Sequence, residues 1–418
     1  MRRIFFFILI LLGSFSGIAQ TRLAKAERFM RENAYARAIP LWKTELDLKE
    51  NIAYRAKLAY CYRMTNNMQA ARIEYEKIID HPRTRTEVFF YYAETLMSEE
   101  RYDEAKTWFK RFMEDHKDDT KAPILITACD QVKYIKPMFP DMAITPFPQN
   151  SDVDDNSPVF WNNGIVFASD RSLGYQFLKE KSGWTNRDYL NLYYAPILGD
   201  TAYGLPRNLS SKINKLNKNM ASASFSKDGK KVYFARNSSI PSKNNVYNIL
   251  LYEGIGTGTG NWGNINELPF SNPELSFMHP AISPDGKTLF FTSNKLGGLG
   301  GMDIYMVKKV NDKEWGKPVN MGDKINTAAH EAFPFFDVQG RLFFCSKGHV
   351  GYGGFDIFYT EKDTNGEWIK PINVGKPINS PYDDISIFIL PDGIHGMFTS
   401  ARDGGDDDIY LFSLPTAK

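Results

Sequence analysis

Side chains that could do chemistry are few in this sequence, and their spacing matches no catalytic pattern. No Gly-x-Ser-x-Gly turn is present to expose a nucleophilic serine. The histidines lack the i, i+4 pairing of a zinc-binding helix, and no cysteine pair accompanies them: His81, His116, His279, His330, His349 and His395. His279, His330 and His349 fall in predicted turns of neighbouring units and could share a site, but ordinary loop histidines are the favoured interpretation.

Two acidic clusters offer carboxylates that could bind calcium. One comprises Asp152, Asp154, Asp155 and Asn156, and the other Asp403, Asp406, Asp407 and Asp408. The first begins like an EF-hand loop, but it lacks the glycine at position six and has Asn163 where the bidentate Glu belongs. Solvated loop carboxylates are therefore the favoured interpretation. We predict no metal site and no cofactor.

A glycine-rich run at residues 254–260 could suggest a phosphate-binding loop. It lacks the last glycine of the dinucleotide pattern and the Lys-Ser/Thr ending of a P-loop, and no helix is expected after it. It is interpreted as a hairpin between strands.

Length and composition indicate a folded chain of two or three domains. The 418 residues are 43% hydrophobic and 14% aromatic, with 31 glycines and 22 prolines, which suggests many strands joined by tight turns. The formal net charge is only +2, so nothing favours nucleic acid as a partner.

The N-terminus has the pattern of a secretory signal. Two arginines precede an apolar run from Ile4 to Leu12, and the small residues Gly17 and Ala19 follow. We expect residues 1–19 to be removed and the mature chain to be periplasmic, with no transmembrane segment. No cysteine follows the run to carry a lipid.

Three cysteines are too few for a disulfide framework. Cys61 and Cys129 could pair in an oxidising compartment, but buried free thiols are favoured, and Cys345 is expected in a strand core.

A helical repeat covers residues 20–135. Ala38, Ala71 and Ala105 lie 33 and 34 residues apart, and an aromatic residue follows each by four positions: Trp42, Tyr75 and Phe109. Another alanine precedes each by twelve: Ala26, Ala59 and Ala93. Small residues where two helices cross, with large ones beside them, are typical of stacked helix pairs. The pattern resembles three tetratricopeptide repeats followed by a cap helix.

The tetratricopeptide resemblance implies a concave groove that binds extended peptides or partner helices. By carry-over, the groove residues would be Glu27, Arg31, Tyr60, Arg63 and Glu94. The alternative, that these side chains are merely solvated, stays open.

A second repeat fills residues 136–418. An Asp-Gly, Asn-Gly or Gln-Gly turn between two apolar runs recurs at glycines spaced 65, 57, 54 and 53 residues apart: Gly164, Gly229, Gly286, Gly340 and Gly393. Such turns predict two-residue hairpins. A glycine-rich stretch with an aspartate at the start of a third strand also recurs, at Asp303, Asp356 and Asp408. These aspartates are expected to accept hydrogen bonds from the preceding turn.

Units of this kind predict the blades of a β-propeller, so the expected fold class is multidomain α + β. Five units are visible, and a sixth would require a degenerate unit within residues 171–220. The last unit lacks its own fourth strand, so the strand near residues 143–148 is expected to complete it and close the ring.

The strand repeat resembles the propellers of TolB-like periplasmic proteins, in its Pro-Asp-Gly-Lys turn and Gly-Gly-x-Asp-Ile-Tyr strand. Tetratricopeptide repeats followed by this propeller resemble the N-terminal part of OmpA-like envelope proteins of Bacteroidetes, one of which serves type IX secretion. In those proteins an OmpA-like domain that binds peptidoglycan follows, and we do not expect this chain to be anchored to peptidoglycan in that way.

The resemblance implies a non-catalytic adaptor for protein partners in a complex at the outer membrane, such as a secretion or gliding apparatus. We therefore predict that the chain is not an enzyme. The alternative is a sensor that binds a small molecule or a cell-wall glycan in the propeller's central opening. A weaker rival is a propeller hydrolase whose loop carboxylates hold a metal.

Overall fold

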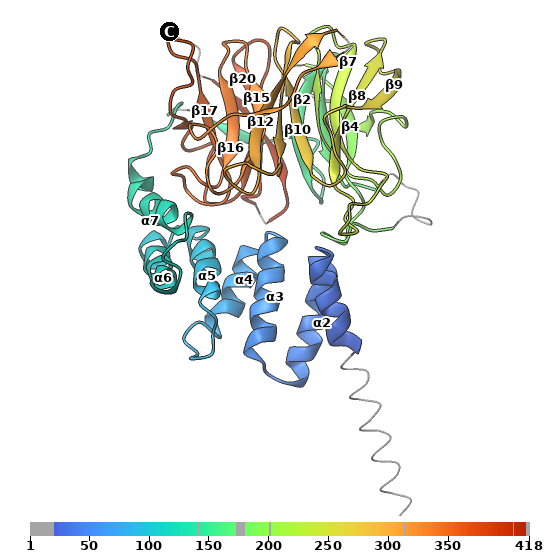
Figure 1. Ribbon diagram of the computed structural model, residues 1–418. Helices are drawn as coiled ribbons and strands as arrows, with labels where there is room; N and C mark the ends of the chain where they lie inside the picture. Colours follow the sequence, from blue (N-terminus) through green and yellow to red (C-terminus); the bar gives the residue numbers. More distant parts are fainter. Residues whose placement is uncertain are drawn as a thin grey trace, which may run out of the picture.

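Helices form the first part of the chain and a five-bladed β-propeller forms the rest (Figure 1). This is a computed structural model, and it describes residues 21–140, 142–172, 180–199, 202–312, 314–403 and 405–414. The predicted signal at residues 1–19 lies outside the described residues.

The helices pack as consecutive antiparallel pairs. Residues 21–31 are helical, and the helices that follow are α2 (Tyr35–Leu48), α3 (Ile52–Met64), α4 (Met68–Glu76), α5 (Glu87–Met97), α6 (Tyr102–Asp115), α7 (Ala122–Gln131) and the 3-10 turn η1 (Val132–Tyr134). All six repeated alanines are completely buried, as are Trp42, Tyr75 and Phe109. The sequence spacing therefore corresponds to the helix contacts, because a residue larger than alanine would hold the helices apart.

The turn inside each helix pair uses a residue in the left-handed region. Asn33, Asn66 and Glu100 have φ of 55°, 59° and 57°. Side-chain caps then start two of the helices, with Asn51 accepting from the backbone of α3 and Asn67 from that of α4.

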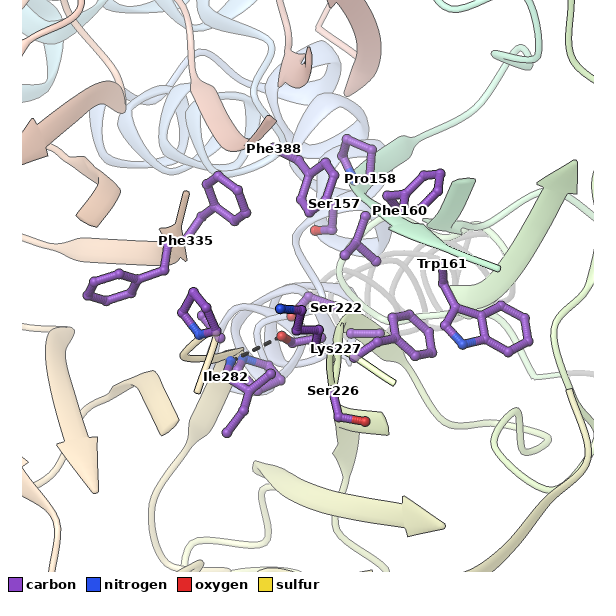
Figure 2. Close-up of a pocket in the computed structure, with 18 of the residues that line it drawn as sticks. Ser157, Pro158, Phe160, Trp161, Ser222, Ser226, Lys227, Ile282, Phe335 and Phe388 are labelled. Atoms are coloured by element: carbon purple, nitrogen blue, oxygen red, sulfur yellow. Dashed lines mark hydrogen bonds between the residues drawn. The ribbon is translucent and has the colours of Figure 1, made fainter. Parts of the chain in front are cut away.

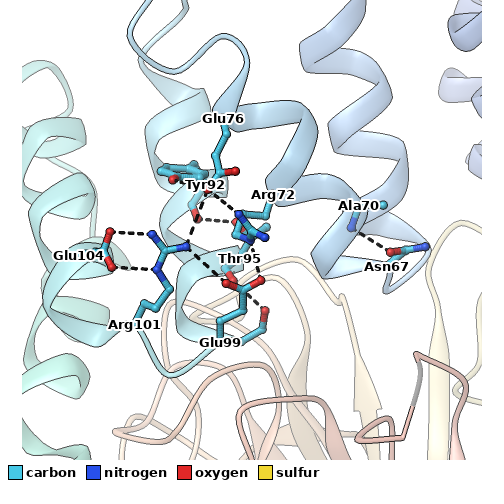
Figure 3. A network of polar contacts seen from close by, with 10 residues as sticks. Asn67, Ala70, Arg72, Glu76, Tyr92, Thr95, Glu99, Arg101 and Glu104 are labelled. Atoms are coloured by element: carbon cyan, nitrogen blue, oxygen red, sulfur yellow. Dashed lines mark hydrogen bonds and ion pairs between the residues drawn. The ribbon is translucent and has the colours of Figure 1, made fainter.

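An ion-pair network joins α4, α5 and α6 (Figure 3). The Arg72 guanidinium contacts Glu76 at 2.5 Å and Glu99 at 2.6 Å, and Arg101 contacts Glu104 at 2.7 Å. Tyr92 adds a hydrogen bond to Glu76 at 3.3 Å. Because Arg72 is mostly buried and shared between two carboxylates, its side chain loses less entropy per pair than an isolated surface bridge would.

Replacing Arg72 with alanine should lower the free energy of unfolding of the helices by about 1 kcal/mol. The matched control is Arg28→Ala, since Arg28 is more than half exposed and its contact with Glu32 is 3.7 Å long. Chemical denaturation followed by circular dichroism at 222 nm measures both. Equal effects of the two variants would show that the network adds nothing beyond an ordinary surface pair.

Five sheets radiate around the propeller axis, and in four of them the strands follow the chain order from the inside outward. Blade 1 contains β2 (Asp155–Trp161), β3 (Gly164–Ser169), β4 (Asn191–Pro196) and β5 (Arg207–Asn208). Blade 2 contains β6 (Met220–Phe225), β7 (Lys231–Asn237), β8 (Ile249–Gly256) and β9 (Trp262–Glu267). Blade 3 contains β10 (Phe277–Ile282), β11 (Thr288–Ser293) and β12 (Asp303–Asn311), with β13 (Glu314–Trp315) and β14 (Val319–Asn320) both paired to β12.

Blade 4 contains β15 (Glu331–Phe336), β16 (Leu342–Ser346), β17 (Asp356–Thr360) and β18 (Ile372–Asn373). Blade 5 contains β19 (Asp384–Ile389), β20 (His395–Ser400) and β21 (Asp408–Ser413), and its outer strand is β1 (Ile144–Pro146). β1 pairs antiparallel with β21, Ile144 opposite Phe412. The ring is thus closed by a strand that precedes the first blade, so the segment leading into blade 1 completes blade 5.

The predicted two-residue hairpin turn is wrong for most blades. In blade 3 the Gly286 amide donates to the Ser283 carbonyl, and the positive φ is confined to the glycine, at 70°. The Asp285 carboxylate instead accepts hydrogen bonds from the Ser283 hydroxyl and the Lys287 amide. A four-residue turn ending in a left-handed glycine therefore joins these strands. Gly229, Gly340 and Gly393 repeat the positive φ, at 66°, 82° and 71°.

The two-residue turn occurs in blade 1, the least regular copy of the repeat. Asn162 and Asn163 both have positive φ, and Trp161 pairs directly with Gly164. Asparagine tolerates this conformation through local hydrogen bonding of its short side chain.

Buried asparagines clamp the third strand of most blades. In blade 4 the Ile357 amide donates to Asn379 Oδ1 at 2.8 Å, and Asn379 Nδ2 donates to the Ile357 carbonyl at 2.8 Å and to Asn373 at 2.7 Å. In blade 3, Asn326 makes the same three hydrogen bonds to the Ile304 amide, the Ile304 carbonyl and Asn320. In blade 1, Asn214 makes them to the Leu192 amide, the Leu192 carbonyl and Asn208. Asn150 pairs with Ile409 in blade 5. Each side chain extends the sheet beyond its short fourth strand.

The helices lie along one face of the propeller (Figure 1). The Tyr102 hydroxyl donates to the Tyr352 carbonyl of blade 4 at 3.0 Å, and Lys376 pairs with Glu100 at 2.9 Å. At the other end, Arg37 donates to the Lys181 carbonyl at 2.8 Å, and the Tyr35 ring meets Trp184 edge to face at 5.1 Å. Within the described residues, no helix has the length and apolar character needed to cross a membrane.

Candidate functional site: the central channel

In every blade the pairing of the innermost strand with the second strand has a register shift, which changes the direction of the side chains beside it. The shifts lie between Asn156 and Val159, Met220 and Ala223, Met278 and Ala281, Ala332 and Phe335, and Ile385 and Phe388. At four of them a non-glycine residue has positive φ: Ser157, His279, Phe333 and Ser386, at 50–56°. Such bulges cost conformational energy and occur preferentially beside functional sites. All four residues line the central channel.

A cavity of about 610 Å³ occupies the channel from these bulges to the turns on the face opposite the helices. Its outer end is formed by turn residues such as Gly229, Pro284, Val338 and Pro391. Figure 2 looks into the ring of lining side chains, with the helices behind it. The cavity therefore opens away from the helical layer, and it is large enough for a small molecule or the end of a chain of sugars.

Two stacked rings belong to the inner end of the cavity lining. The His279 and Phe333 rings, from blades 3 and 4, lie 3.6 Å apart between centres and nearly parallel. Burial lowers the pKa of His279 to about 3, so its imidazole is neutral at pH 7.

Serines are among the lining residues in blades 1, 2, 3 and 5, and two of the hydroxyls in blade 2 have unused hydrogen-bonding capacity. Ser224 Oγ accepts from the Ile282 amide of the next blade at 3.1 Å (Figure 2), which leaves its own hydrogen free to donate. Ser222 is 6% exposed, and its Oγ has no hydrogen-bond partner within the protein. A buried hydroxyl without a partner costs free energy, and a bound ligand could remove that cost.

The charged lining residues lie at the outer end of the cavity. Lys227 and Asp228 are both exposed turn residues of blade 2. Hydrogen bonds from the Ser226 hydroxyl and the Lys230 amide hold the pKa of Asp228 below its usual value. Among the described lining residues Asp228 is the only carboxylate, whereas glycoside hydrolysis by acid and base requires two.

The residues predicted for the helical groove lie apart from this channel, and the structure brings only some of them together. Arg63 pairs with Glu94 at 2.9 Å, and its guanidinium lies over the rings of Tyr60 and Tyr91, 5.6 and 4.5 Å from their centres. Glu27 pairs with Lys57, and Arg31 is exposed. A groove of about 1240 Å³ lies between α3 and α5, and of the five predicted residues it is lined by Tyr60. Tyr75, which the sequence analysis assigned to the packing of the helices, and Arg55, which it did not single out, also line it.

The repeated aspartates have local partners. Asp303 accepts from the amides of Leu299 and Gly300 at 2.6 and 3.0 Å, and Asp356 from those of Tyr352 and Gly353 at 2.9 and 3.3 Å. Asp408 differs, because burial and the nearby carboxylates, Asp155 among them, raise its pKa to about 6. Two of the three thus secure a turn.

The two acidic clusters meet at the seam between blades 5 and 1. The Asp407 amide donates to Asp154 Oδ1 at 3.1 Å, and Arg187 contacts Asp154 at 3.3 Å and Asp406 at 2.5 Å. Burial and the neighbouring Asp154 raise the pKa of Asp170 to about 7. In the described part of the chain, no group of three or more histidine, cysteine, aspartate or glutamate side chains could hold a metal ion.

The three candidate histidines have separate partners. His279 stacks on Phe333 in the channel, His349 contacts the Ile325 carbonyl at 2.9 Å, and His330 lies beside Met302 at an isolated bridge. The three cysteines are buried and free.

Comparisons with known proteins give structural neighbours only. The sequence matches no family model, and it matches no curated protein sequence. Among solved structures, the α-L-arabinofuranosidase of Lactobacillus brevis has a TM-score of 0.42 at 11% identity, over 65% of this chain and 94% of that one. The exo-β-1,3-galactanase 1,3Gal43A of Clostridium thermocellum has a TM-score of 0.41 at 13% identity, over 66% of this chain and 63% of that one. The tricorn protease has a TM-score of 0.35 at 14% identity, over 64% of this chain but only 25% of the protease chain.

These neighbours correct the functional prediction. They are enzymes, and two of the three are glycosidases by name, which contradicts both the non-catalytic adaptor and the prediction that the chain is not an enzyme. At 11–14% identity they transfer no activity and no substrate to this chain.

Proposed function

We propose that the propeller binds a small molecule or a glycan in its central channel. The observation that carries the proposal is the buried, unpartnered hydroxyl of Ser222 in the wall of a 610 Å³ cavity that opens on the face away from the helices. A concave, mostly apolar cavity with a few polar groups is the usual form of a ligand site.

The experiment is calorimetry with monosaccharides, oligosaccharides and soluble cell-wall fragments. Ser224→Trp places an indole in the cavity and should abolish binding, whereas Ser211→Trp, at an exposed serine outside the channel, should leave it unchanged. Circular dichroism checks that both variants fold. Binding that survives in a folded Ser224→Trp protein would contradict the channel as the site.

A second variant removes one hydroxyl without filling the cavity. Ser222→Ala breaks no hydrogen bond within the protein, so it should fold at least as well as the parent. Loss of one neutral hydrogen bond, worth about 1 kcal/mol, should weaken the ligand about fivefold. An unchanged affinity would mean that the ligand does not use this hydroxyl.

We further propose that the helices are tetratricopeptide repeats and that the chain works in the periplasm, near the outer membrane. The six buried alanines in register support the first, and the N-terminal sequence pattern supports the second. Crosslinking in the native envelope with mass spectrometry tests the setting. Recovery of the chain only in the cytoplasmic fraction would contradict it.

A further inference from the structure

Apolar side chains line the channel on every side. In Figure 2, Phe335 and Phe388 lie on one side of the opening, and Phe160 and Trp161 lie on the other. A ligand that fills the channel therefore buries apolar surface all around, which favours an apolar body. The large apolar residues of this wall are, from blade 1 to blade 5, Phe160 and Trp161, Phe225, Ile282, Phe335 and Phe388.

Few hydroxyl groups of the lining are available to a ligand. Ser222, beside the register shift of blade 2, has no partner for its hydroxyl, and Ser224 keeps its hydrogen free. The other lining serines donate their hydroxyl hydrogens within the protein: Ser157, Ser226, Ser283 and Ser386. Two free hydroxyls in a cavity of about 610 Å³ suit a ligand with few polar atoms better than a polyhydroxylated one.

Among the described lining residues, Lys227 offers the available charge, and it lies at the outer end. It is exposed, and its ammonium group has no hydrogen bond or ion pair with the described part of the chain. The neighbouring Asp228 is already engaged, because its carboxylate accepts from the Ser226 hydroxyl at 2.6 Å and from the Lys230 amide at 3.1 Å. At the inner end His279 is neutral at pH 7, because burial lowers its pKa. An anionic group is therefore favoured at the rim and no charge is favoured inside.

The free hydroxyl and the free charge lie toward opposite ends of the cavity. Ser222 belongs to β6, and Lys227 to the turn that follows this strand. Five residues of extended chain span at most about 16 Å. A ligand that meets both groups must therefore be elongated.

We infer that the ligand is an organic anion with an elongated apolar body, which fills the aromatic channel while its anionic group meets Lys227 at the rim. The inference rests on the proposed function of the channel. An acceptor atom near the far end of the body would receive the Ser222 hydroxyl hydrogen. The apolar wall supplies most of the affinity, because an exposed ion pair contributes little.

The test is calorimetry at pH 7 with probes that vary the charge and the body separately. Octanoate, dodecanoate and phenylpropanoate are compared with their primary amides and with amines of the same body, and gluconate carries the charge without the apolar body. At least one apolar carboxylate should bind. Its amide and its amine should bind roughly two- to fivefold more weakly, as expected for the loss of an exposed ion pair. Gluconate should bind at least about tenfold more weakly, because it buries little apolar surface.

Two variants locate the groups responsible. Lys227→Met should weaken the carboxylate to the level of its amide and leave the amide unchanged. Lys230→Met is the matched control, since Lys230 is exposed in the same turn but lies outside the cavity lining, and it should change neither. Phe388→Ala should weaken the carboxylate and the amide alike, by about tenfold. Circular dichroism checks that the variants fold.

The outcomes separate this inference from the function on which it rests. An amide that binds as tightly as its carboxylate, with Lys227→Met changing neither, overturns the anionic class but leaves the channel as a binding site if Ser224→Trp abolishes both. Gluconate binding as tightly as octanoate overturns the apolar body, and failure of every apolar carboxylate to bind overturns the whole inference. If no small molecule or glycan bound in a way that Ser224→Trp abolished, the proposed function would fall as well.

Discussion

Phe147→Ala is expected to lower the free energy of unfolding of the propeller by about 3–4 kcal/mol. Phe147 follows the closing strand β1 and is 2% exposed. Its ring meets Tyr203 and Phe167 of blade 1 edge to face at 4.8 and 5.8 Å, while its amide donates to the Ile409 carbonyl of blade 5 at 2.8 Å. The side chain therefore joins the last blade to the first, and its removal leaves a cavity at the seam of the ring.

Urea denaturation followed by tryptophan fluorescence measures this loss. Thr145→Ala is the matched control, because Thr145 lies in the same strand but is exposed, and such substitutions usually change stability by less than 0.5 kcal/mol in either direction, roughly. If both variants unfolded at the same urea concentration, packing of the closing segment would not hold the ring together. The helices also contact blades 1 and 4, so the full chain is used throughout.

Asn379→Ala is expected to cost about 2–4 kcal/mol. Asn379 is 1% exposed and makes three hydrogen bonds, two of them to the backbone of Ile357 in the third strand of blade 4. Alanine leaves the Ile357 amide and carbonyl buried without these partners, and each unsatisfied group costs roughly 1–3 kcal/mol. The effect should therefore exceed that of losing a single exposed hydrogen bond.

The control for this variant is Asn266→Ala, an exposed asparagine on the outer strand β9. Thermal unfolding should shift by several degrees for Asn379→Ala and hardly at all for Asn266→Ala. Amide hydrogen exchange adds a local measurement, since Ile357 should lose protection before the rest of the strand. A shift no larger than that of the control would show that the short fourth strand suffices without the asparagine clamp.

The repeats could be predicted from the sequence because the contacts that their residues make lie within one unit or between adjacent units. The alanine spacing indicated the helix pairs, since Ala71 and Ala105 lie where neighbouring helices touch and admit no larger side chain. The recurring turn glycines indicated five blades, because a left-handed residue is needed between the first two strands; glycine supplies it in four blades, and Asn162 and Asn163 supply it in blade 1. The turn itself was wrong in type: Asp285 caps its own loop through its carboxylate and does not adopt the positive φ of a two-residue turn.

The asparagine clamp was within reach of the sequence but was missed. In three blades an asparagine stands two positions after a proline, and a second asparagine follows six positions later. These pairs are Asn208 and Asn214, Asn320 and Asn326, and Asn373 and Asn379. The partner of each clamp is a backbone group about 22 residues earlier, so the pattern has meaning only once the third strand is placed.

The sequence by itself determined the succession of helix pairs and sheet units, because contacts between chain neighbours repeat with the period of the unit. Only the tertiary structure decided the channel. It collects one strand from each of five blades. Lining residues such as Ser222 and Ser224 occupy positions at which the units differ, so they carry no periodic signal. The same is true of the seam between the first and last blades, where Arg187 contacts Asp154 of blade 1 and Asp406 of blade 5. Closure of the ring brings these residues together, and no local sequence pattern predicts that contact.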